Sequence, residues 1–330
     1  MRTLFRLFAF VVLLAVAGGG YVLYRLSQPY SGFSEPVFVE FPKGTSTAGM
    51  ARVLAEKGVV QDAWLFLAAR AVRRGAHLQA GEYRFEKPAS ALDVYGRISR
   101  GDIYYMELLI PEGYNLFDIA AAVEKLGAMK AATFLAAAKN PALIRDLDPR
   151  AETLEGYLFP NKYRVYRHTT AQQICRQMTN EFRQQWQALK TSRNVHETVT
   201  LASLVEKEAK LPEERPKVAS VFRNRLDQGI KLDCDPTTVY AALLENRYRG
   251  VIHRSDLDNR NPYNTYQHTG LPPGPIANPG LRSLQATLQP AETKYLFFVA
   301  KADGSGGHNF SESLRQHEAA VAQYHRASGH

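Results

Sequence analysis

The sequence predicts an α+β protein with three parts: an N-terminal transmembrane helix, a small β-α-α-β module and a larger domain of mixed α/β structure. An uncharged apolar run lies at residues 7–24. Short alternating segments typical of strands are interspersed with longer segments of helical periodicity. From about residue 155 the chain is richer in aromatic residues, Asn, Pro and Gly. The expected parts are residues 1–26 (N-terminus and anchor), 27–36 (linker), 37–103 (small module) and 104–330 (larger domain).

The apolar run Leu7–Tyr24 is close to the roughly 20 residues that span a bilayer. Arg2 and Arg6 precede it, and Arg25 is the first charge after it. This charge pattern predicts a cytoplasmic N-terminus and, with one apolar run of this length, a single-pass membrane protein. A cleavable signal peptide is the alternative, because residues 15–20 include several small side chains. We favour an uncleaved anchor, since the apolar run continues beyond these residues.

The linker Ser27–Pro36 is rich in Ser, Pro and Gly, and at about 3.3–3.6 Å per residue it reaches only some 35 Å. The folded body is therefore expected to lie close to the membrane. The net charge is +9. In an exported protein this charge suits anionic headgroups or an anionic polymer rather than nucleic acid, or it serves only solubility.

Two cysteines, Cys175 and Cys234, lie far apart in the sequence. An exported context permits a disulfide between them without indicating one. The chain has no P-loop, no G-x-G-x-x-G and no zinc-like spacing of Cys and His. No metal and no cofactor is therefore predicted.

Turn and capping residues divide the first part of the folded body into alternating elements. The expected elements are a strand at 37–41, helices at 47–57 and 62–74, a strand at 81–85 and a helix at 91–100. The triplet Pro42-Lys-Gly44 and the helix after it return at the same offset from Pro111-Glu-Gly113. This echo predicts two copies of one strand–turn–helix unit.

The larger domain is expected to be mainly helical. Residues 155–166 are predicted as a strand or loop, and 260–280 as a long loop of the kind that carries function. The expected helices are 170–190, 197–210, 216–229, 237–244, 283–288 and a final one from 313, with a strand at 295–300 and a Gly-rich hairpin at 303–307.

The helix around Leu201–Lys210 carries the leading candidate for a general acid. At 100° per residue, Glu206 lies roughly 65° from the centre of the apolar stripe and Glu208 roughly 95° away on the other flank. A carboxyl group pressed against apolar surface loses hydration and holds a proton near neutral pH, as a general acid must. The alternative for Glu206 is a boundary residue that reaches solvent or pairs with an arginine.

One acid with an aromatic and amide-rich groove suits cleavage of a sugar chain. The groove candidates are Tyr157, Phe159, Tyr163, Tyr263, Asn264, Thr265 and Tyr266, although any of these aromatics could instead be core packing. Glu155, Glu208 and Asp235 are candidate partner carboxylates, and Asp235 also suits a helix N-cap. Arg223 could orient a carboxylate or face solvent. His308 could carry a proton or make a structural hydrogen bond.

Seven motifs follow one another in a characteristic order: EGYLFP (155–160), LVEKE (204–208), VFRNRL (221–226), DPT (235–237), YNTY (263–266), GLPPGPIANPG (270–280) and GGHNF (306–310). In these motifs and in its N-terminal anchor the chain resembles the MltG (YceG-like) family of membrane-anchored endolytic murein transglycosylases. The chain departs from the family pattern at Asn161-Lys162 and at Cys234, which suggests that Cys234 lies near the site.

The resemblance implies that the small module is LysM-like and that Glu206 is the catalytic acid. It implies cleavage between N-acetylmuramic acid and N-acetylglucosamine in nascent peptidoglycan, leaving 1,6-anhydro ends without a second protein carboxylate. The implied substrate-binding residues are Glu155, Tyr157, Arg223, Asn224, Asp235, Tyr263, Asn264, Thr265, Tyr266, Asn278 and His308.

The expected partners are peptidoglycan strands, the membrane and the peptidoglycan synthases (penicillin-binding proteins), with the catalytic domain in the periplasm. Two alternatives remain open from the sequence. One is a hydrolytic muramidase that uses water and a second carboxylate. The other is a wall-binding scaffold without catalysis.

Overall fold

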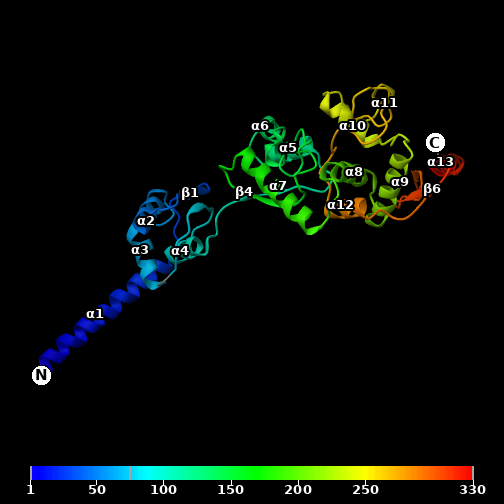
Figure 1. Ribbon diagram of the computed structural model, residues 1–330. Coiled ribbons are helices and arrows are strands. Elements are labelled where there is room, and N and C mark those ends of the chain that lie inside the picture. The colour runs from blue at the N-terminus through cyan, green and yellow to red at the C-terminus, as the bar shows by residue number, and fades with distance from the viewer. Residues whose placement is uncertain (1, 74–75, 329–330) are drawn as a thin grey trace. The chain divides into compact units, whose positions relative to one another are not determined.

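The computed structural model describes residues 2–73 and 76–328 (Figure 1). The chain divides into two compact units, Met1–Tyr105 and Met106–His330. A cluster of buried apolar side chains holds the first unit together, and further clusters hold the second. The units are therefore described separately.

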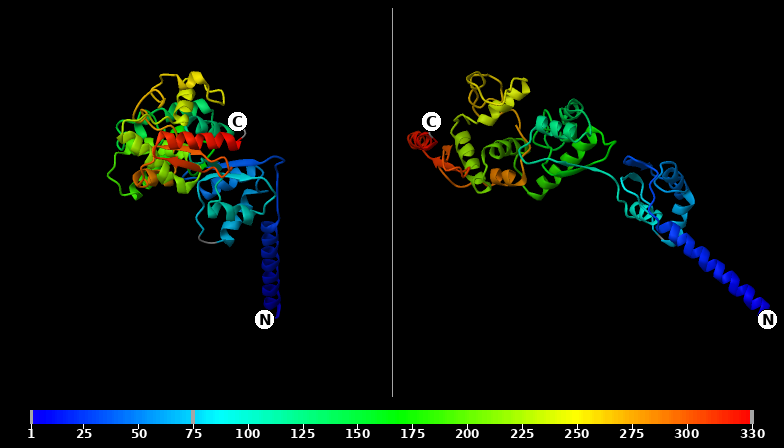
Figure 2. Two further views of the ribbon diagram at one scale, coloured as in Figure 1. Left: turned by 90° about the vertical axis from the view of Figure 1, so that its right-hand side faces the viewer. Right: turned by 180° about the vertical axis from the view of Figure 1, so that it is seen from behind.

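The first unit begins with α1 (Arg2–Ser27), which is exposed over almost its whole length (Figure 2). The helix is long and apolar enough to cross a bilayer, and its apolar window is 0% buried. Its last turns contact the module: Leu26 is fully buried, and Val22 packs against the same apolar cluster. The predicted apolar anchor is thus one continuous helix, as membrane anchoring requires.

The module follows as β1 (Val37–Phe41), α2 (Thr47–Glu56), α3 (Ala63–Val72), β2 (Gly81–Phe85) and α4 (Ala91–Arg100). The strands pair antiparallel with Val39 opposite Tyr83. A capping box between Ser90 and Asp93 begins α4. The predicted β-α-α-β order is confirmed, whereas the predicted end of the second helix at Arg74 lies outside the described residues.

The second unit opens with β3 (Met106–Leu109), α5 (Leu116–Lys125), α6 (Ala131–Ala138), η1 (Pro141–Leu143), β4 (Lys162–Val165) and α7 (Ala171–Ala188). Strands β3 and β4 pair antiparallel, so the 155–166 segment supplies a turn and then a strand. Strand β3 lies where the second strand–turn–helix unit predicts a strand, whereas α6 was not predicted. Helix α6 has only eight residues, too few for its periodicity to stand out.

The predicted echo between the two Pro-x-Gly triplets is confirmed at the level of local structure. Gly44 and Gly113 both have positive φ, 88° and 78°, a conformation that glycine adopts without steric cost. Each glycine joins a strand to a helix, β1 to α2 and β3 to α5. The second copy places Glu112 beside the end of the helix that carries the candidate acids.

The remainder of the second unit contains α8 (Val195–Glu208), η2 (Pro212–Glu214), α9 (Arg215–Asp227), α10 (Asp235–Leu244), α11 (Arg254–Leu257), α12 (Leu281–Leu288), β5 (Phe297–Ala300), β6 (His308–Ser311) and α13 (Leu314–Ser328). Helix α8 packs against α9, α10 and α12. As a result, every residue from Thr198 to Val205 is buried. The helix is enclosed on nearly all sides rather than along one stripe.

Glu155 and Asn278 form a buried polar junction that joins four segments of the second unit: the turn at 155–158, α5, α10 and the 270–280 loop. The Glu155 carboxyl accepts hydrogen bonds from Leu116 N (2.9 Å), Tyr240 Oη (2.9 Å) and Asn278 Nδ2 (2.9 Å). Burial raises the pKa of Glu155 to about 8. Asn278 Oδ1 also accepts from Leu158 N at 2.8 Å. This junction fixes the loop that ends beside α8.

We expect Asn278→Ala to lower the free energy of unfolding by about 2–4 kcal/mol. The substitution leaves the buried Leu158 N–H and the Glu155 carboxyl without the hydrogen bonds that Asn278 makes to them. Urea denaturation measures this loss. Asn180→Ala, a truncation of an exposed asparagine on α7, is the matched control and should change stability by less than about 0.5 kcal/mol. Equal effects of the two variants would contradict the proposed importance of the junction.

Candidate active site

The end of α8 carries the two candidate acids, Glu206 and Glu208, on different sides of the helix. Glu206 is held by two groups: Arg215 Nη2 donates to its Oε1 at 2.8 Å, and Gly280 N donates to its Oε2 at 2.9 Å. Its side chain is only 4% exposed and that of Arg215 is 8% exposed. Glu206 is therefore buried and paired with an arginine, and the arginine pair is one of the two alternatives that the sequence analysis left open.

A further carboxylate, Glu112, lies beside Glu206 and was missed by the sequence analysis. Arg215 Nη2 is 3.4 Å from Glu112 Oε2, so one guanidinium is shared by both acids. Burial and the charge of Glu206 raise the pKa of Glu112, while Arg215 and Arg282 act in the opposite direction. The only signal in the sequence was the Glu that stands in the second Pro-x-Gly triplet where the first has Lys.

Glu208 has a different environment. Its Oε1 accepts a hydrogen bond from the Cys234 thiol at 3.2 Å. Burial raises the pKa of Glu208, the nearby charge of Asp235 raises it further, and Cys234 and His308 lower it. No arginine or lysine is paired with Glu208 among the described residues. These surroundings favour the protonated form of the Glu208 carboxyl over the charged form, which is the direction that a general acid needs.

Glu208 borders a cavity of about 480 Å³ formed by α8, α9, the start of α10, the 260–280 loop, β5 and α13. Asp235 and Tyr266 lie on the same wall, and Tyr266 Oη donates to Asp235 Oδ1 at 2.7 Å. Phe297 and Phe298 supply aromatic surface. The cavity thus brings an acid, a second carboxylate and aromatic side chains together, which is the composition expected of a sugar-binding site.

His308 lies near this site but is engaged in a structural pair. Its Nδ1 is 2.7 Å from Glu214 Oε2, and its backbone N donates to Glu214 Oε1 at 3.0 Å. Its ring meets Phe298 edge-on, with centroids 5.2 Å apart. The pair with Glu214 joins β6 to η2.

Several other predicted site residues lie beneath the surface and support it. Each is at most 2% exposed: Glu155, Tyr157, Asn264, Thr265 and Asn278. The Asn264 amide donates to three carbonyls at the end of α11 and just after it. Thr265 Oγ1 accepts from Cys234 N at 3.0 Å. Their polar atoms bond within the protein, so they shape the site rather than line it.

The remaining predicted residues are divided between support and surface. Asn224 donates to the carbonyls of Thr293 and Tyr295, both at 2.9 Å, and so holds the approach to β5. The Tyr263 ring packs on Tyr240 at 5.1 Å. Arg223 does not line the Glu208 cavity. It lines a second cavity along the first half of α8. Of the predicted substrate-binding residues, Asp235 and Tyr266 line the Glu208 cavity. The prediction did not separate them from residues that only support the site.

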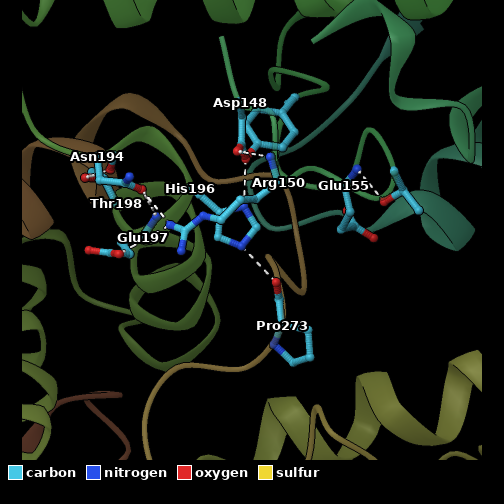
Figure 3. Close-up of polar contacts among 10 residues, drawn as sticks. Asp148, Arg150, Glu155, Asn194, His196, Glu197, Thr198 and Pro273 are labelled. Atoms are coloured by element: carbon cyan, nitrogen blue, oxygen red, sulfur yellow. Dashed lines mark hydrogen bonds and ion pairs between the residues drawn. The ribbon is translucent and has the colours of Figure 1, made fainter. Parts of the chain in front are cut away.

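This second cavity, of about 520 Å³, lies along the first half of α8. His196 forms one wall and is fixed at both ring nitrogens, 2.7 Å from Asp148 Oδ2 and 2.8 Å from Pro273 O (Figure 3). At the edge of this cavity, Arg150 Nη2 donates to Asn194 Oδ1 at 2.8 Å. The arrangement holds the 270–280 loop against α8, far along the helix from Glu208.

The two cysteines are both buried free thiols. Cys175 lies in the apolar cluster of α5, α6 and α7, while Cys234 lies in the cluster of α8, α9 and α10. The disulfide that an exported context permits is therefore not formed. Cys234, which the sequence analysis expected near the site, donates to Glu208 Oε1 at 3.2 Å.

Comparison with known proteins places the chain in a family. The profile of the YceG-like family matches residues 39–323. An endolytic murein transglycosylase of Bacillus subtilis is 32% identical over 330 residues, covering 93% of this chain and 90% of the relative. One from Streptococcus pneumoniae is 28% identical over 355 residues, and the match covers 96% of this chain but only 64% of the longer relative.

A crystal structure of a YceG-like protein from Listeria monocytogenes shares the fold, with a TM-score of 0.56 and 31% identity over 86% of this chain and 99% of that chain. The family profile extends from β1 of the module to α13 and includes every residue of the Glu208 cavity. The chain therefore belongs to the YceG-like family.

Proposed function

We propose that this protein is an endolytic murein transglycosylase that cuts nascent peptidoglycan strands between N-acetylmuramic acid and N-acetylglucosamine. The names of its relatives in Bacillus subtilis and Streptococcus pneumoniae support this activity. The observation that carries it is one carboxyl group with a raised pKa at a polar and aromatic cavity. Glycosidic cleavage needs such a group to protonate the leaving oxygen.

We assign the role of general acid to Glu208 rather than to Glu206. A general acid must hold its proton until the substrate arrives and must have access to it. Glu208 borders the cavity and has no cationic partner among the described side chains. Glu206 is bonded to Arg215 and to Gly280 N. Those bonds suit Glu206 to tie α8, α9 and the 270–280 loop together behind the acid.

The proposed reaction proceeds without water. Glu208 protonates the glycosidic oxygen as the bond from C1 of the muramic acid to that oxygen breaks. The C6 hydroxyl of the same sugar then forms the new bond to C1. Its proton passes to the Glu208 carboxylate, which restores the acid. The products are a 1,6-anhydromuramic end and a free 4-hydroxyl, so the atoms balance without a co-reactant.

We place the protein in the inner membrane, with its N-terminus in the cytoplasm and both folded units in the periplasm. The length and apolar composition of α1 and the arginines that precede it support this orientation. We propose that the β1–β2 module is LysM-like and contacts glycan. The linker between α1 and β1 holds it near the membrane, where the peptidoglycan synthases that release new strands are the expected partners.

Because Asp235 lines the same cavity as Glu208, a hydrolytic muramidase is the second candidate function. Two carboxylates that flank a glycosidic bond can also catalyse hydrolysis, with one of them activating water. Mass spectrometry of the released muropeptides separates the two reactions. We expect 1,6-anhydro ends from the transglycosylase, whereas reducing ends with incorporated solvent oxygen would establish a muramidase.

We expect Glu208→Gln to lower the rate of strand cleavage by about 10³-fold, because the amide cannot donate the proton. Glu206→Gln is the matched variant on the same helix, and it should retain most of the activity of any protein that folds. Muropeptide release from purified glycan strands measures both rates. A severe loss in Glu206→Gln with wild-type activity in Glu208→Gln would reverse the assignment.

We expect Asp235→Asn to move the alkaline fall of the pH–rate profile toward lower pH by about 0.5–1 unit. The charge of Asp235 raises the pKa of Glu208, so its removal lets Glu208 lose its proton earlier as pH rises. Asp258→Asn, at the exposed residue that follows α11, is the control and should leave the profile unchanged. An unshifted profile in Asp235→Asn would show that Glu208 is not the titrating acid.

A further inference from the structure

Helix α3 carries a second apolar face that does not pack on the module. Exposed side chains spaced i, i+3, i+7 and i+8 share one side of the helix: Trp64, Leu67, Ala71 and Val72. Trp64 is 44% exposed, Leu67 40% and Val72 51%. On the opposite side of the helix, Leu65, Phe66 and Ala69 are buried in the core of the module. A helix that is apolar on both sides is typical of one covered on both sides.

The start of α3 is tied to the place where the apolar run of α1 ends. Arg25 is the first charge after that run, and its Nη2 donates to Gln61 Oε1 at 2.9 Å. The same nitrogen lies 3.7 Å from Asp62 Oδ2, and Asp62 is the N-cap residue of α3. The first turn of α3, with Trp64, therefore lies at the level where the chain would leave the hydrocarbon.

Contacts within the first unit keep α3 at this level. The helix contacts α1, and Val22 and Leu26 of α1 pack into the same apolar cluster as Leu65 and Phe66. Figures 1 and 2 show α3 at the end of the module from which α1 projects. A membrane that surrounds α1 would meet this end of the module first.

We infer that the exposed face of α3 lies in the headgroup region of the outer leaflet as a second membrane contact. The inference rests on the membrane anchoring proposed above. A tryptophan at the start of an apolar stripe is the residue type that membrane interfaces favour. With α1 crossing the bilayer and α3 lying on it, the module is fixed in orientation instead of swinging on one helix.

Fluorescence of Trp64 tests the contact in the full chain. The sequence has two tryptophans, and Trp186 is buried in the second unit, so Trp186→Phe leaves Trp64 as the only emitter. The protein is reconstituted in vesicles of phosphatidylethanolamine and phosphatidylglycerol with or without bromine on the acyl chains. We expect a shift to shorter wavelength and a loss of emission in the brominated vesicles.

Two controls keep the result specific. Trp64→Phe retains only the buried Trp186 and should show no quenching by bromine. Leu67→Glu in the Trp186→Phe protein should reduce the quenching while the protein still floats with the vesicles through α1.

Emission at the wavelength of exposed tryptophan, unaffected by bromine, would overturn the inference. A shift without quenching would also overturn it, because a second copy or another protein would then cover the face. A protein that fails to float with the vesicles would instead contradict the anchoring by α1. Strand cleavage is not read in this experiment, so a failure of the proposed activity remains distinguishable.

Discussion

Desolvation of the Glu208 carboxyl is the constraint on which the account of this site depends. The group lies at the C-terminal end of a helix enclosed by α9, α10 and α12, and the Cys234 thiol is its hydrogen-bond donor. A thiol is a weak donor, so it stabilises a charge less than an arginine would. The neighbouring Asp235 adds repulsion. Both effects favour the protonated acid next to a cavity large enough for part of a sugar chain.

The rest of the second unit holds this group in place. Glu206, two residues earlier, is bonded to α9 through Arg215 and to the 270–280 loop through Gly280 N. Asn278 and Glu155 fix the same loop to α5 and α10. Thr265 Oγ1 accepts a hydrogen bond from the backbone N–H of Cys234. Side chains that bond only within the protein thus determine where Glu208, Asp235 and Tyr266 meet.

Most elements could be predicted from the sequence because local signals mark their ends, such as the capping box of Thr170 and Gln173 at the start of α7. The surroundings of the two acids could not be predicted in the same way. Ranking Glu206 and Glu208 by angle assumed that α8 is buried along one stripe, but residues 198–205 are all buried, so the angle from a stripe does not rank the burial of the two carboxylates. The partners of Glu206 and Glu208 come from segments whose approach depends on tertiary packing, which periodicity does not encode.

The most direct test of the central claim is a titration of Glu208 itself. Carboxyl carbon NMR of protein labelled at glutamate, with the signal assigned through Glu208→Gln, gives its pKa in the folded protein. We expect the pKa of Glu208 in the wild-type protein to lie clearly above the ordinary 4.5 of a glutamate. In Asp235→Asn we expect this pKa to be lower and closer to 4.5. A pKa at or below the ordinary value in the wild-type protein would contradict the claim that this carboxyl is the acid of the site.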